Sequence, residues 1–160
     1  MKSLIQTVVV AVSGSESSLN AAKYGIVMAK HYSLRLVGVY VVDTATLREL
    51  LLSKIFVEDE SAEYEKSLEE NGRRYLNYVQ GLAAGKGVEM EKVLRRGAIS
   101  TEVIRAAEEV NADLILLGGF EESKGFRDAL SRQRREVVRN AKCSVLIVKA
   151  PGIDSTFNKA

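Results

Sequence analysis

Five short apolar runs alternate along the chain with stretches whose apolar residues recur at helical spacing. The runs are Leu4–Val12, Leu34–Val42, Val88–Leu94, Asp113–Leu117 and Ser144–Val148. Most of them lack a polar–apolar alternation, which is typical of strands buried on both faces of a parallel sheet. The stretches between them predict helices over about 15–31, 60–83, 100–111 and 127–141, and a shorter helix within 44–56.

This alternation predicts one doubly wound α/β domain. Connections of this length imply right-handed crossovers, so we expect a five-stranded parallel sheet in the order 3-2-1-4-5 with helices on both faces. Val88–Leu94 partly alternates and is expected at an edge of the sheet. Pro151 stops the last strand, so residues 1–150 form the domain and 151–160 a loose C-terminal tail. Leu4–Val12 also resembles a short signal peptide, but a core strand explains it better.

Ser13, Gly14 and Ser15 follow the first strand directly and lead into the first helix. Backbone can approach closely at a glycine, and the free N–H groups of a helix start attract anions, so this turn is a candidate binding site. The plainer interpretation is a tight turn with serine caps, and these residues alone favour it. Gly118 and Gly119 end the fourth strand, across the predicted switch point, where two such turns could hold a nucleotide between them.

Composition excludes several classes of partner. The formal net charge is +2, Trp is absent and aromatic residues make up 6% of the chain, so no nucleic-acid partner is expected. No apolar run approaches the roughly 18 residues of a membrane helix, so no membrane partner is expected. Cys143 is the only cysteine, which fits a reducing compartment and a cytoplasmic location.

Neither catalytic residues nor a metal site are expected. The chain has one His and one Cys, too few for a typical zinc site. His31 lies at the far end of the first predicted helix, roughly 20 Å from Ser15 at a rise of about 1.5 Å per residue, which argues against a Ser–His pair. The P-loop pattern is absent, and no Gly-x-Gly-x-x-Gly follows the first strand. We therefore expect a protein that is not an enzyme.

Three segments carry a resemblance to a known family: Val10–Ser18, Ala112–Gly118 and Val137–Val148. The last is the most specific, although Ser144 stands where the family usually has proline. Through them the chain resembles the universal stress protein family from Thr7 to Lys149. The resemblance implies an adenine nucleotide alpha hydrolase-like fold and a role in the stress response, with ATP as a cofactor to be tested.

In nucleotide-binding members of that family, Gly-x-x-Gly, nine residues and then Gly-[Ser/Thr] hold the phosphates and ribose. The spacing is present here, but of these positions only Gly118 keeps the expected residue. Glu121 and Ser131 replace the second and third glycines, Arg132 replaces Ser/Thr, and Ser13 replaces an aspartate. The Glu121 carboxylate would repel phosphate, whereas the Arg132 guanidinium suits it.

Three functions follow, in decreasing order of preference. The first is a non-enzymatic stress-response protein with a degenerate nucleotide pocket, which acts as a homodimer with protein partners still unknown. The second is a sensor of ATP or another adenine nucleotide that uses Gly14, the backbone near Val41, Gly118 and Arg132. The third is a nucleotide-cleaving enzyme, because Ser13–Ser17 differs little from the Ser-Gly-Gly-x-Asp-Ser loop of ATP pyrophosphatases.

The last strand is expected to be an exposed apolar edge, which is an aggregation hazard unless it is paired or covered. The resemblance implies antiparallel pairing across a two-fold axis, with Val145 and Ile147 near the axis and Leu146 and Val148 in the same interface. The alternative cover is the tail. A basic stretch over 124–142 and an acidic stretch over 58–70 are expected to be solvated faces, or to face each other within one chain or between partners. An anion site on the basic stretch is the less favoured alternative.

Overall fold

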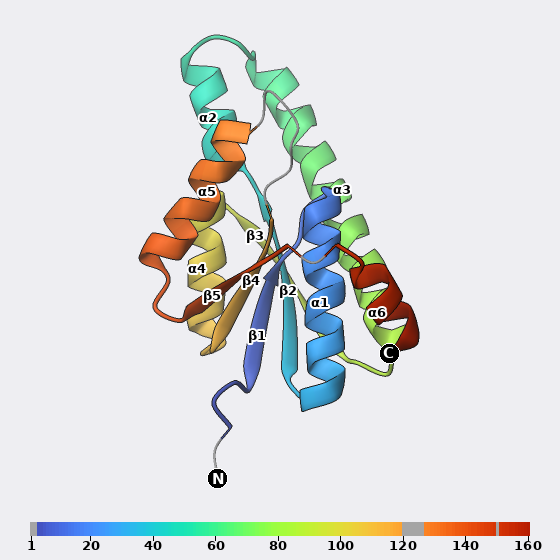
Figure 1. Cartoon of the computed structure of the whole chain (residues 1–160). Coiled ribbons are helices and arrows are strands. Elements are labelled where there is room, and N and C mark those ends of the chain that lie inside the picture. The colour runs from blue at the N-terminus through green and yellow to red at the C-terminus, as the bar shows by residue number, and fades with distance from the viewer. Residues whose placement is uncertain (1–2, 120–126, 150) are drawn as a thin grey trace.

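The computed structural model describes residues 3–119, 127–149 and 151–160, and over 127–131 it describes the course of the helix alone. Five parallel strands form one sheet in the order β3-β2-β1-β4-β5 (Figure 1). The predicted fold class and strand order are confirmed. The strands are β1 (Thr7–Ala11), β2 (Arg35–Val42), β3 (Met90–Arg96), β4 (Leu114–Gly118) and β5 (Ser144–Val148).

Helices cover both faces of this sheet. One face carries α1, α3 and α6, and the other carries α4 and α5, while α2 lies beyond the carboxyl ends of the strands (Figure 1). The helices are α1 (Glu16–Tyr32), α2 (Thr44–Leu52), α3 (Glu58–Gly85), α4 (Ile99–Glu109), α5 (Arg127–Asn140) and α6 (Ile153–Lys159).

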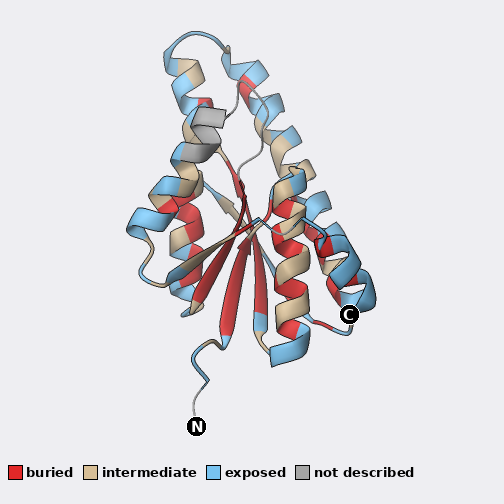
Figure 2. Cartoon of the chain, in the orientation of Figure 1, coloured by how far each residue is buried: buried red, intermediate tan, exposed pale blue. Residues whose placement is uncertain are grey.

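The central strand β1 is buried on both faces, which explains its unbroken apolar run. Val8 and Val10 pack into the core beneath α1 and α3, whereas Val9 packs into the core beneath α4 and α5. All three side chains are almost completely buried, and Figure 2 shows the central strands as the most buried part of the molecule. Both cores therefore share the same strand.

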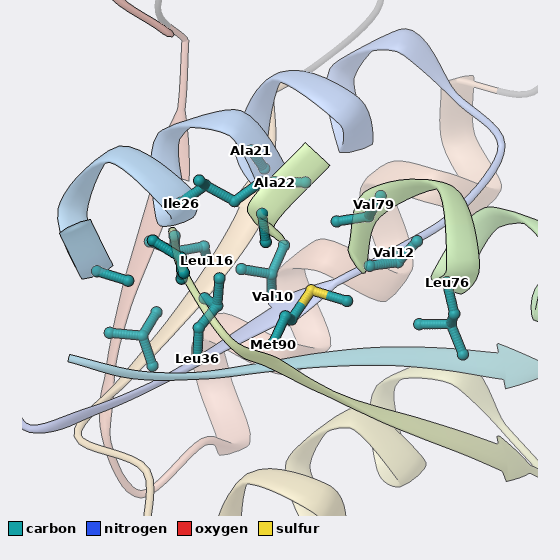
Figure 3. Close-up of a cluster of buried hydrophobic side chains, with 14 of the residues drawn as sticks. Val10, Val12, Ala21, Ala22, Ile26, Leu36, Leu76, Val79, Met90 and Leu116 are labelled. Atoms are coloured by element: carbon teal, nitrogen blue, oxygen red, sulfur yellow. The ribbon is translucent and has the colours of Figure 1, made fainter. Parts of the chain in front are cut away.

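Small residues let α1 lie close to the sheet. A Cβ atom at Gly25 would lie 2.9 Å from a methyl carbon of Val10 and 3.0 Å from one of Leu116. Ala22 and Ile26 of the same helix point at this part of the sheet (Figure 3). This close packing fixes the start of α1 relative to the ends of β1 and β4, where the candidate site lies.

The buried face of α3 contains small residues as well as large apolar ones. Tyr64 and Tyr75 are 49% and 37% exposed, while Gly72 and Leu76 lie in the buried face. A Cβ atom at Gly72 would clash with the ring of Tyr40. A glycine, which does not contribute to an apolar pattern, therefore marks the line of closest approach between α3 and β2.

The C-terminal tail, expected to be loose, is the helix α6. Its residues Ile153 and Phe157 are spaced one turn apart, are both buried and pack the helix against α1. The Lys86 ammonium lies 4.8 Å from the centroid of the Phe157 ring, and Lys23 forms an ion pair with Asp154 at 2.6 Å. The seven-residue helix is too short to give a strong periodic signal in the sequence.

The third strand begins two residues later than predicted. The Val88 N–H donates to the Ala83 carbonyl, and Gly87 has a φ of 75°, so both residues belong to the turn that closes α3. Met90 is the first residue paired with β2, opposite Leu36. The predicted edge position of this strand is confirmed.

Candidate functional site

A cleft of about 240 Å³ opens at the carboxyl ends of β1, β2 and β4. This is the switch point of the sheet: the chain passes from β1 to β2 on one side and later crosses from β3 to β4 on the other side of β1. Open α/β sheets bind their ligands at such a point. One wall is apolar and includes Val39, Val41 and Leu117. The polar lining includes Ser13, Ser15, Ser17, Gln133 and Arg134.

The serine turn forms a chain of hydroxyl groups. The Ser15 hydroxyl accepts the Ser18 N–H at 3.1 Å and is therefore the N-cap of α1. It also lies 3.0 Å from the Ser13 hydroxyl and 3.3 Å from the Ser17 hydroxyl. The Ser13 N–H donates to the Ser18 hydroxyl at 2.6 Å. The predicted serine cap is confirmed, and these hydroxyls are engaged with one another.

The three candidate glycines each lie against a neighbouring group. A Cβ atom at Gly118 would lie 2.6 Å from the carbonyl carbon and oxygen of Ser17, so the first turn of α1 requires a glycine there. At Gly119 it would lie 2.7 Å from the Val148 carbonyl oxygen, which places this residue against the end of β5. At Gly14 it would lie 2.6 Å from the Tyr75 hydroxyl.

Tyr75 and Tyr40 link this turn to α3. Tyr40 lines the cleft and is buried, and its ring centroid lies 6.4 Å from that of Tyr75. Burial raises the pKa of Tyr40, and the neighbouring Tyr75 and Tyr64 raise it further. The Tyr40 phenol is therefore a neutral group in the lining of the cleft. No motif in the sequence signals this contact, because α3 is remote along the chain.

The arginine at the cleft is Arg134 and not the predicted Arg132. Arg134 lines the cleft, and its guanidinium donates to the Ser17 hydroxyl at 3.4 Å. Arg132 is exposed and lies with Arg135 and Arg139 on the outer surface of α5. The spacing of the family motif selected Arg132, whereas the turn of the helix brings the residue two positions later to the cleft.

Two further side chains of α5 hold α4 in place. The Gln133 side-chain oxygen accepts the Ser100 N–H at 3.0 Å, and the Ser100 hydroxyl donates to Glu136 at 2.8 Å. Ala98 occupies the N-cap position of α4, and its side chain makes no capping hydrogen bond. Two polar side chains of α5 therefore hydrogen-bond to the first turn of α4. These bonds hold α5, and with it Arg134, in a fixed position against α4.

Val41 lies in the wall of the cleft, as predicted for the residue whose backbone would face a nucleotide. Nearby Asp43 caps α2: its carboxylate accepts the Thr46 N–H at 3.1 Å and the Thr46 hydroxyl at 2.7 Å. Glu121 lies outside the described residues, and at Ser131 the structure describes only the helix backbone. The effect of these two replacements on nucleotide binding therefore stays a prediction.

Neither a metal cluster nor a membrane span is found in the described part of the chain. Over residues 3–119, 127–149 and 151–160, no group of three or more His, Cys, Asp and Glu side chains could hold a metal ion. Within the same ranges no helix combines the length and the apolar character that crossing a bilayer requires.

The model of the universal stress protein family matches residues 5–149. The chain belongs to the universal stress protein family. A universal stress protein of Methanocaldococcus jannaschii is 31% identical over 157 residues, which cover 94% of this chain and 85% of that protein. The resemblance noted in the three sequence segments is thereby confirmed.

Solved structures of the family share this fold. A universal stress protein family member from Burkholderia pseudomallei is 25% identical with a TM-score of 0.72, over 94% of this chain and all of that chain. A universal stress protein in complex with cAMP is also 25% identical, with a TM-score of 0.62 over 91% of this chain and 98% of that chain. The family therefore includes a member that binds an adenine nucleotide.

Proposed function

We propose that this universal stress protein is a non-enzymatic regulatory protein of the stress response whose degenerate pocket binds adenine nucleotides weakly or not at all. The observation that carries the proposal is that the polar groups lining the cleft are hydrogen-bonded to one another. The hydroxyls of Ser13, Ser15 and Ser17 bond to one another, and Arg134 donates to Ser17. A phosphate would have to break these contacts before it could form its own.

The size of the cleft supports the same proposal. Its volume of about 240 Å³ lies below the range of about 300–1,000 Å³ that is usual for small-molecule sites. The Tyr75 hydroxyl also lies directly over Gly14, on the turn that would have to approach a phosphate. A nucleotide with three phosphates therefore needs a rearrangement of this turn.

The absence of enzymatic activity is proposed from the chemistry of the residues that line the cleft. A nucleotide-cleaving enzyme needs a group that activates water or takes up a proton. Asp43 is the carboxylate among the described residues that line the cleft, and Thr46 already donates two hydrogen bonds to it. His31, the only histidine of the chain, is exposed at the opposite end of α1.

A second function, an adenine-nucleotide sensor, is favoured by two observations. The relative that binds cAMP covers nearly the whole chain. In addition, the cleft combines an apolar wall at Val39 and Val41 with one guanidinium, that of Arg134. An apolar wall suits a base, and a single arginine suits a single phosphate.

Mass spectrometry of the freshly purified, denatured protein tests the proposal first, and co-purified nucleotide would favour the sensor. Calorimetry with cAMP, AMP and ATP with Mg²⁺ then measures affinity. We expect dissociation constants weaker than micromolar, and micromolar binding of ATP would contradict the degenerate pocket. Arg134→Ala should weaken any residual binding by about tenfold or more, while Arg132→Ala on the outer surface of α5 serves as the matched control.

We also propose that the protein is a homodimer formed through β5. This strand is an edge of the sheet, and its residues Val145, Leu146 and Ile147 are only partly buried in the single chain. Antiparallel pairing with a second copy would satisfy the edge and close the assembly around a two-fold axis. Sedimentation at micromolar concentration distinguishes the dimer from a monomer.

A further inference from the structure

Two exposed surfaces of this chain carry opposite charge and apolar side chains. We name the first the α2–α3 tip: Leu52, Ile55, Val57, Glu58, Asp59, Glu60, Glu63 and Tyr64. We name the second the α5 stripe: Arg132, Arg135, Val138 and Arg139. Both lie outside the cleft and its lining residues.

The α2–α3 tip exposes more apolar surface than a solvated connection requires. Leu52, Ile55 and Val57 are 78%, 64% and 61% exposed. They lie at the end of the molecule beyond the carboxyl ends of the strands, where Figure 2 shows mostly exposed residues. Phe56 and Tyr64 pack edge to face with ring centroids 5.7 Å apart, so the connection is held against α3. Exposed apolar groups gathered in this way mark interaction sites.

The carboxylates of the tip have no ion-pair partner among the described residues. Within the acidic stretch 58–70, Glu65 and Glu69 form ion pairs with Arg96, and Glu69 also pairs with Arg73. The described structure shows no ion pair for Glu58, Asp59, Glu60 or Glu63 and none between 58–70 and α5. The expectation that the acidic and basic stretches face each other within one chain is not met over the described residues.

The α5 stripe occupies the outer face of its helix. Arg132, Arg135 and Arg139 are spaced by three and four residues, which places them along one face. All three are exposed and lack an ion-pair partner among the described residues, while Val138 beside them is 51% exposed. Glu136, the acidic neighbour of these arginines on α5, does not pair with them in the part of the chain that the structure describes; its carboxylate accepts a hydrogen bond from the Ser100 hydroxyl.

We propose that the α2–α3 tip of one copy docks on the α5 stripe of a second copy, in a reciprocal contact that is separate from the β5 edge. Charge complementarity favours a second copy as the partner, because the stripe has unpaired cations that match the unpaired carboxylates of the tip. Val138 supplies an apolar contact for Ile55 or Val57. Helix α5 begins near α2 and runs away from the tip toward the start of β5 (Figure 1), so the tip and the stripe are separate patches of one chain. Two copies can therefore exchange both contacts around one two-fold axis.

Charge reversal tests the contact in the intact protein. One variant carries Asp59→Arg and Glu63→Arg, and the other carries Arg135→Glu and Arg139→Glu. Like charges then meet twice in each homodimer, so sedimentation should show self-association through this contact weakened by about tenfold or more, with a strong dependence on salt. In a mixture of the two variants both contacts are complementary again, so association should recover.

Recovery on mixing is the decisive result, because misfolding of either variant cannot produce it. Lys30 is exposed in the last turn of α1 and belongs to neither surface, so Lys30→Glu is the matched control and should leave association unchanged. Equal association of the wild type and both variants, or no recovery in the mixture, overturns the proposal.

Cross-linking separates this contact from pairing through β5. In a Cys143→Ser background, chains with Val57→Cys are mixed with chains carrying Val138→Cys and oxidised mildly. We expect a disulfide-linked heterodimer, and none when Tyr32→Cys, which is 71% exposed at the far end of α1, replaces Val57→Cys. A protein that sediments as a dimer but forms no 57–138 cross-link would support pairing through β5 and overturn the contact between tip and stripe.

Discussion

Gly118→Ala should destabilise the protein through a clash with backbone. The added Cβ would lie 2.6 Å from the carbonyl carbon and oxygen of Ser17 and 2.8 Å from the Ser17 hydroxyl oxygen. These distances are far inside van der Waals contact, and a backbone carbonyl cannot rotate away as the end of a long side chain can. The first turn of α1 must therefore move, although Gly25 and Ala22 hold the same helix against the sheet.

The size of the effect follows from the cost of overpacking a tight core, which is about 1–3 kcal/mol. Replacing glycine by alanine restricts the unfolded chain and returns about 0.4–1 kcal/mol, so the net loss of stability is up to about 2.6 kcal/mol. At about 2–4 °C per kcal/mol for a domain of this size, the melting temperature should fall by up to about 10 °C. Urea unfolding followed by circular dichroism measures the free energy directly.

Gly81→Ala is the matched control. Gly81 lies in the exposed interior of α3, and an added Cβ would meet nothing within 4 Å. This variant should be more stable than the wild type by roughly 0.5–1 kcal/mol, because alanine has the higher helix propensity. If Gly118→Ala were as stable as Gly81→Ala, the close approach of Ser17 to β4 would be refuted.

Three further predictions address the cleft, the edge strand and the buried phenol. Arg134→Ala should weaken any binding of cAMP or AMP by about tenfold or more, as expected for loss of a charged hydrogen bond, and Arg132→Ala should leave the calorimetric titration unchanged. Ile147→Pro removes an edge N–H and should give monomer or insoluble protein in sedimentation, and an unchanged dimer would place the interface elsewhere. Because the pKa of Tyr40 is raised in the fold, stability should be constant below about pH 10 and fall as the pH rises further, and denaturant unfolding of Tyr40→Phe should show a smaller fall.

The fold was predictable because its strongest signals are local. The unbroken apolar runs of β1 and β4 require a sheet covered on both faces, and the length of the connections then fixes the parallel topology. The errors fall where a local signal is weak or absent. Helix α6 relies on two buried residues, Ile153 and Phe157, and α3 meets Tyr40 through Gly72, which no apolar pattern can reveal.

The candidate site was only partly predictable. Ser15 acts as the cap that its residue type and position suggest, and Val41 lines the cleft. Arg134 and Tyr75 were missed for different reasons. The contact of Arg134 depends on the rotation of α5 about its axis, which a motif spacing does not encode. The contact of Tyr75 with Gly14 depends on how two elements far apart along the chain pack together.

The glycine that the chain retains from the nucleotide motif has a structural explanation that does not involve a ligand. Gly118 is required by the backbone of Ser17, and it also pairs with Val148 in the sheet. A chain that had lost nucleotide binding would still need this glycine in order to fold. Retention of Gly118 therefore does not distinguish the degenerate pocket from the sensor, whereas the residues at the other motif positions do. The replacement of both remaining glycines, by Glu121 and Ser131, is the part of the sequence that favours the degenerate pocket.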